Sequence, residues 1–176
     1  MKKSKRITKA LQEAFPFIDP KIAKAMILEG IQNAESKTSC EFKLFIAFRS
    51  VPYLLYKALP KKNKATRNML MKNVGSCAKS QLRKLVAGKT KEKNGILFYF
   101  SLQEKMFYVI ADKAIYHVLT QKRLDEYAES IATGMREQKG LSFITSTMNE
   151  MTKVLAPHFP HAKNDINEIP DSIEVG

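Results

Sequence analysis

The most unusual polar stretch of the chain is an acidic segment near its C-terminal end. Residues 164–171 read Asn-Asp-Ile-Asn-Glu-Ile-Pro-Asp, so several carboxylate and amide oxygens stand within a few positions. Hard cations such as Ca²⁺ take about 6–8 oxygen ligands of this kind. The segment is not an EF-hand loop, because the Asp spacing and the central glycine of that loop are missing. By itself it is more typical of a solvated tail than of a binding site.

A second candidate is Asp112, the first charged residue after an apolar run. Two such runs, 96–100 and 106–111, have strand length and are rich in aromatic and β-branched residues. Neither alternates with polar residues, which predicts strands that are covered on both faces, and the short linker 101–105 predicts a hairpin. Since α/β proteins often place a ligand site where a buried strand ends, Asp112 is a predicted binding position.

Other chemical motifs are weak or missing. His158 and His161 lie three residues apart, but no HExxH motif or cysteine cluster accompanies them, so zinc is poorly supported. The sequence holds no GxGxxG, P-loop or GxSxG motif. Cys40 and Cys77 fit no CxxC pattern and are expected to be reduced thiols, with Cys77 on the apolar face of a helix.

The charge is divided unevenly along the chain. The net charge is +13, and residues 1–93 hold 22 Lys and Arg against 6 Asp and Glu, a difference of +16. Residues 94–176 hold 8 against 11, a difference of −3. The basic half could attract a polyanionic partner, although a solvated basic face is the simpler interpretation.

Apolar periodicity predicts the order helix, strand, helix, strand, strand, helix, helix after a short N-terminal helix. This order favours a mixed sheet with helices on its faces. We expect residues 1–18 to form a basic extension or short helix, and residues 19–176 to form a single α/β domain. The apolar segment 53–59 is expected to be a helical turn or a flap whose tyrosines and leucines pack, and residues 161–176 to be an irregular tail. The predicted helices are 4–14, 19–34, 63–88, 121–139 and 141–155, and the strands are 41–48, 96–100 and 106–111.

The start of the chain, MKKSKR, is similar to the charged region of a signal peptide, but no apolar run of export length and no cleavage site follow it. The most apolar segment, 42–59, is interrupted by Lys43, Arg49, Pro52 and Lys57, so it does not predict a membrane span. We therefore expect a soluble cytoplasmic protein.

Several short motifs, in this order and spacing, resemble the TPM domain, a family with plant thylakoid, nematode and bacterial members. The resemblance covers roughly residues 22–174. It implies a three-layer α/β/α sandwich with a mixed central sheet, and a divalent cation, calcium especially, bound by acidic residues near the sheet edge. The motifs are IQNAE at 31–35, TSCE at 38–41, NGIL at 94–97, IADKAI at 110–115, HFP at 158–160 and NDINEIPD at 164–171.

By position, the resemblance implies metal ligands at Asp112, Asn164 and Asp165, with Glu41, Asn167 and Asp171 as further contributors. The leading hypothesis is a calcium-binding interaction module with an unknown protein partner or polyanion. One alternative, a weak metal-assisted acid phosphatase, rests on the resemblance to the plant members. A second is a basic module that docks nucleic acid or an anionic membrane surface, and a third is a purely structural tail. The chain departs from the family at Asn164, because relatives usually have two acidic residues where this chain has Asn164 and Asp165. It also departs over the basic stretch 49–93, which has little counterpart in the family.

Overall fold

The computed structural model describes residues 2–60, 63–86, 90, 93–161 and 172–176. Its elements in chain order are α1 (Lys2–Ala14), α2 (Pro20–Glu35), β1 (Glu41–Ala47), α3 (Tyr53–Ala58), α4 (Lys64–Leu85), β2 (Gly95–Ser101), β3 (Met106–Ala111), the 3-10 turn η1 (Ile115–His117), α5 (Gln121–Arg136), α6 (Gly140–Leu155) and β4 (Ile173–Val175).

The strands form a mixed four-stranded sheet in the order β3-β2-β1-β4. β1 runs parallel to both β2 and β4, while β2 and β3 form the antiparallel hairpin that the two apolar runs predicted. A parallel pair needs a long crossover, and here α3 and α4 make the connection from β1 to β2.

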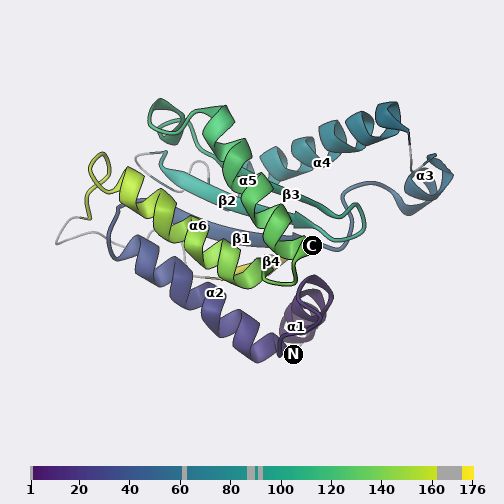
Figure 1. Ribbon diagram of the computed structural model, residues 1–176, viewed down its shortest axis with the longest axis horizontal. Helices are drawn as coiled ribbons and strands as arrows, with labels where there is room; N and C mark the ends of the chain where they lie inside the picture. Colours follow the sequence, from purple (N-terminus) through teal and green to yellow (C-terminus); the bar gives the residue numbers. More distant parts are fainter. Residues whose placement is uncertain (1, 61–62, 87–89, 91–92, 162–171) are drawn as a thin grey trace.

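Alternate residues of β1, β2 and β3 enter two separate apolar cores, so the fold is an α/β sandwich with a helical layer on each face of the sheet. Phe42, Leu44 and Ile46 of β1 pack in the larger core with residues of α1, α2, α5 and α6. Phe45 and Ala47 pack in the smaller core with residues of α4. In Figure 1, α2, α5 and α6 cross one face of the sheet, and α4 extends past the sheet with α3 at its far end.

Local signals explain where the main helices begin. Asp19 caps α2 by accepting hydrogen bonds from the backbone N–H groups of Lys21 and Ile22 at 2.8 and 3.3 Å, and Pro20 occupies the first helical position. Asn63 caps α4 in the same way, accepting from Ala65 N at 2.8 Å. Both helices begin within one residue of their predicted starts, because capping is decided by residues next to each other in the chain.

Three features differ from expectation. β4 lies inside the segment that we predicted to be irregular, since a three-residue strand carries no periodicity of its own. The first three residues of β3 are only partly buried, because β3 is an edge strand. The apolar side chains of α3 were expected to pack, yet α3 contains no buried residue. None of the helices in the described ranges has the length and apolar character needed to cross a membrane.

Candidate metal centre

Asp112 follows β3 directly and lies beside the first residue of β2. Its backbone N–H donates to the Gly95 carbonyl at 2.7 Å, and its Oδ1 accepts from Lys113 N at 2.7 Å. Its Oδ2 is buried and has no hydrogen-bond partner among the described residues. Because β3 is antiparallel to β2, Asp112 lies at the edge where β1 and β2 begin, opposite the carboxyl ends at which parallel sheets usually bind ligands.

Glu41, the first residue of β1, is only 6% exposed and lies at the same edge. It is paired in register with Gly95, which bonds to Asp112 from the other side. The two carboxyl residues are therefore two strand spacings apart, about 10 Å between Cα atoms. Val86 of the α4 layer packs over the gap, since a Cβ at Gly95 would lie 1.7 Å from Val86 Cγ1. The structure thus places Glu41 and Asp112 at one edge, on either side of a glycine.

Lys43 adds a positive charge to this edge. It lies two residues after Glu41, on the same face of β1, and is 1% exposed. A buried ammonium group needs compensating negative charge or hydrogen bonds nearby.

Further oxygen-bearing side chains surround the same edge. Glu35 Oε1 accepts from Phe42 N at 2.8 Å, and Asn94 Nδ2 donates to the Ser39 carbonyl at 2.5 Å. Thr90, in the connection that leads into β2, is 5% exposed, and its Oγ1 has no hydrogen-bond partner in the described part of the chain. No group of three or more His, Cys, Asp or Glu side chains in the described residues is arranged to hold a metal ion.

The remaining predicted ligands, Asn164, Asp165, Asn167 and Asp171, lie outside the described residues. The residues that flank them are described. Pro160 forms a β-bridge with Thr38, just before β1, and Ile173 is paired with Leu44 within β1. The described residues on either side of the acidic segment, Pro160 and Ile173, therefore lie beside Thr38 and Leu44.

The ionisation of Tyr116 reflects the local electrostatics. Burial raises the pKa of this phenol, a hydrogen bond with the Ala111 backbone opposes the rise, and the negative charges of Asp125 and Asp112 add to it. The phenol thus stays neutral at physiological pH, in a region of negative potential.

A second polar cluster, which the sequence did not reveal, lies at the opposite ends of β1 and β2. Glu104 in the hairpin turn is 7% exposed and accepts from the backbone N–H groups of Ser50 and Val51 at 3.1 Å each. It also accepts from Ser101 Oγ, and Ser50 Oγ lies 2.8 Å from the Tyr99 hydroxyl. The members are too far apart in the chain for any local motif to indicate them. Because their polar groups are mutually hydrogen-bonded, we interpret this cluster as a clamp that holds the loop after β1.

No family model matches the chain, and no curated protein matches it either. The solved structures that are similar to it include the following two. The BA42 protein from the psychrophilic bacterium Bizionia argentinensis is 23% identical, with a TM-score of 0.68, over 88% of this chain and 92% of that one. The N-terminal domain of a protein from P. gingivalis is 14% identical, with a TM-score of 0.49, over 80% of each chain. The likeness to BA42 supports the α/β fold, and membership of the TPM family stays a prediction.

Proposed function

We propose that this chain is a TPM-like domain that binds a divalent cation, calcium in the first place, at the edge where β1 and β2 begin and β3 ends. The observation that carries the proposal is Asp112 Oδ2, a buried carboxylate oxygen without a hydrogen-bond partner among the described residues. Burying such an oxygen costs free energy unless a donor or a cation satisfies it.

The chemistry of the edge favours a hard cation. Glu41, Thr90 and Asn94 offer oxygen atoms, as Ca²⁺ prefers, and Ca²⁺ accepts irregular geometry more readily than Mg²⁺ does. We propose that the acidic segment adds oxygens to this edge, with Asn164 and Asp165 as its leading ligands, because the described residues before and after it, Pro160 and Ile173, pair with Thr38 and with Leu44 of β1.

The direct test is thermal unfolding of chelator-treated protein during titration with calcium, with magnesium and zinc in parallel. A ligand that binds the native state alone raises stability by RT ln(1 + [L]/Kd), about 2.7 kcal/mol at one hundred times Kd. We expect a saturable rise in Tm with calcium and a smaller one with magnesium. Asp112→Asn keeps the shape of the side chain but removes its charge, so this variant should lose most of the rise.

The control variant is Glu150→Gln, which removes an exposed carboxylate from α6. It should respond to calcium as the parent does. If Asp112→Asn also responds as the parent does, the cation site is not at Asp112. If the parent shows no response at millimolar calcium, the buried oxygen is satisfied within the protein and the proposed function is wrong.

A further inference from the structure

The surface that the cation proposal leaves unexplained is the projection formed by α3 and the first two turns of α4, residues 52–60 and 63–71, which we term the arm. In Figure 1 the arm extends beyond the sheet at the end opposite the Asp112 edge. None of the six residues of α3 is buried. The side chains of α3 therefore face solvent, whereas the first turns of α4 bury Thr66 and Leu70.

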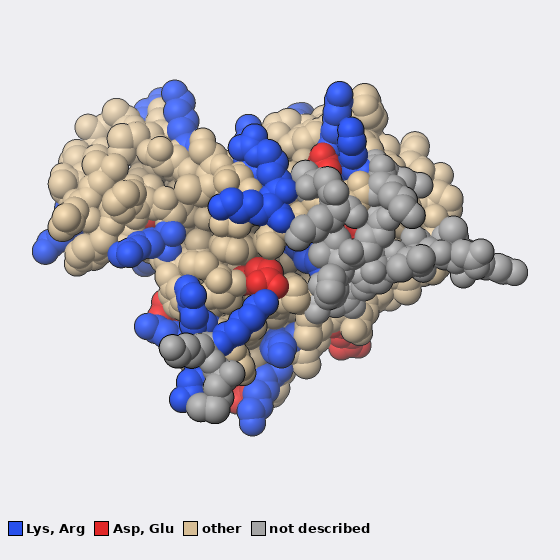
Figure 2. All heavy atoms as spheres, turned by 180° about the vertical axis from the view of Figure 1, so that it is seen from behind, with Lys and Arg blue, Asp and Glu red and all other residues tan. Residues whose placement is uncertain are grey.

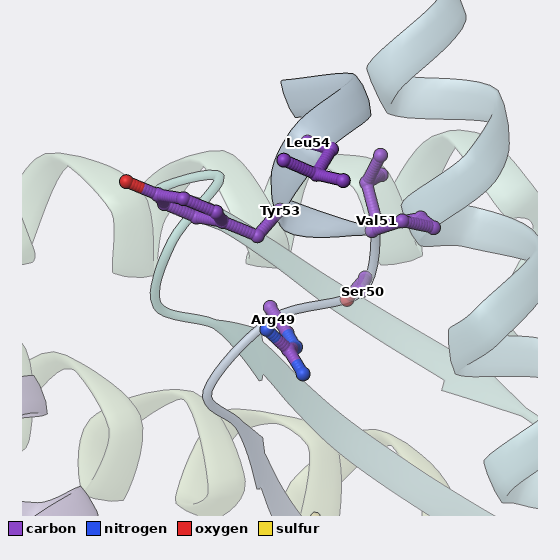
Figure 3. Close-up of a pocket in the computed structure, with 6 residues that line it drawn as sticks. Arg49, Ser50, Val51, Tyr53 and Leu54 are labelled. Atoms are coloured by element: carbon purple, nitrogen blue, oxygen red, sulfur yellow. The ribbon is translucent and has the colours of Figure 1, made fainter. Parts of the chain in front are cut away.

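The arm exposes large apolar side chains. Leu54 is 79% exposed and Tyr53 is 52% exposed, while Met71 and Leu55 are 45% and 44% exposed. Figure 3 shows Tyr53 and Leu54 projecting from the start of α3, around an open hollow that Arg49 and Ser50 also line. Tyr53, Leu54 and Leu55 are consecutive, and exposed apolar residues grouped in this way are typical of surfaces that meet a partner.

The base of the arm is held firmly, so the exposed side chains do not reflect a loose end. Val51 is 2% exposed, and its N–H and carbonyl bond to Glu104 and Gln103 at 3.1 and 3.2 Å. Cys77 Sγ donates to the Ser50 carbonyl at 3.4 Å, and the Tyr108 hydroxyl donates to the Met71 carbonyl at 2.7 Å. The clamp around Glu104 thus fixes the direction in which the arm points.

The charge around this apolar tip has one sign. Residues 42–91 contain 13 Lys and Arg and no Asp or Glu. The exposed cations near the tip form no salt bridge with any described residue; they are Arg49, Lys57, Lys64, Arg67 and Lys72. In Figure 2 the projecting lobe on the left has a broad uncharged surface with Lys and Arg around its margin.

We propose that the arm docks this protein on an anionic phospholipid bilayer. Leucine and methionine side chains would enter the boundary between headgroups and acyl chains, Tyr53 would lie at the headgroup level, and the surrounding cations would contact lipid phosphates and carboxylates. Nucleic acid would use the same cations, but it gains from stacked aromatic rings and offers no apolar medium for Leu54 and Leu55. The exposed leucines together with the surrounding cations therefore favour a membrane over nucleic acid as the partner.

The test is co-sedimentation of the full chain with phosphatidylcholine vesicles, with or without phosphatidylserine, in the presence of chelator. The chelator removes calcium bridging, so the outcome does not depend on the cation site at Asp112. We expect binding only to vesicles that contain phosphatidylserine, and weaker binding as the salt concentration rises.

Two variants separate the contributions of the arm. Leu54→Gln should weaken vesicle binding about tenfold, and its matched control is Phe17→Gln, at a 70% exposed apolar residue far from the arm in the chain. Arg67→Gln should weaken it about fivefold, against Lys122→Gln on α5 as control. All four positions are exposed, so each variant should keep the parent's circular dichroism spectrum and Tm.

The proposal is overturned if the protein does not bind anionic vesicles at low salt, or if it binds neutral vesicles equally well. It is also overturned if Arg67→Gln weakens binding while Leu54→Gln does not. That result would mean a purely electrostatic surface, and tighter binding to a single-stranded oligonucleotide than to vesicles would then identify nucleic acid as the partner.

Discussion

At the residue scale, the carboxyl groups at the two ends of β3, Glu104 before it and Asp112 after it, are in opposite situations. Glu104 is surrounded by donors: two backbone N–H groups, a serine hydroxyl and the Gln103 amide. Asp112 has one donor on Oδ1 and none on Oδ2 within the described residues. Buried polar groups are nearly always satisfied, so the fold itself accounts for Glu104, whereas Asp112 Oδ2 leaves room for a further donor or a cation. This difference is why the cation proposal is centred on Asp112.

Tyr99 provides a pH-dependent test of the Glu104 clamp. Burial raises the pKa of its phenol from 10.0 to about 12, and the hydrogen bond with Ser50 offsets only part of that rise. The unfolded chain therefore loses this proton before the folded protein does. The stabilising contribution is complete below about pH 10 and is lost as the pH rises towards 12.

We expect urea unfolding of the parent to show this loss of stability between pH 10 and pH 12. Tyr99→Phe should be less stable at neutral pH, because Ser50 loses a partner, and should show a smaller loss over the alkaline range. An unchanged alkaline loss in Tyr99→Phe would mean that another group titrates there.

At the scale of elements, the sequence predicted what depends on neighbours in the chain. The long helices carry a 3.6-residue apolar period and local caps, and β2 and β3 are apolar runs joined by a short turn, so both patterns were readable. β4 was missed because its three residues are recognised only by pairing with Leu44 to Ile46. The exposure of α3 was missed because apolar residues usually pack. That Asp112 lies at the end of the sheet where β1 and β2 begin follows from how the three strands pair, and no local sequence pattern encodes this pairing.

Two helical glycines, Gly134 in α5 and Gly75 in α4, are expected to respond to alanine substitution with opposite changes in stability. A Cβ at Gly134 would lie 2.4 Å from Cγ of Phe143, so Gly134→Ala should destabilise the protein by about 1–3 kcal/mol through overpacking. A Cβ at Gly75, inside α4, would meet the Tyr108 ring at an ordinary 3.5 Å. Gly75→Ala should therefore stabilise by about 0.5–1 kcal/mol, because alanine favours the helix. Chemical denaturation of both variants measures the two signs, and equal signs would contradict the packing described for these helices.

At the scale of the whole molecule, the two proposed surfaces lie at opposite ends of the same strands. Glu41 and Asp112 lie at the end of the sheet where β1 begins. The arm follows the other end of β1 in the chain. The basic residues 42–91 include the arm, and the acidic residues of 164–171 follow α6. This separation allows cation binding and membrane docking to be measured independently, and Leu54→Gln should leave the calcium response intact.

β4 gives the most direct test of whether the end of the chain completes the cation site. Ile173 is 2% exposed, and it pairs with Leu44 of β1 two residues after the acidic segment. Ile173→Ala should cost about 3 kcal/mol in the free energy of unfolding, as for other buried isoleucines. If the segment supplies ligands, the variant should also need more calcium for half of the stabilising effect. Ile131→Ala, at a fully buried position on α5, should lose similar stability but keep the parent's calcium midpoint. If both variants need the same calcium concentration for half of the stabilising effect, the acidic segment does not contribute to cation binding. Ile173→Ala would then have changed only the stability of the protein.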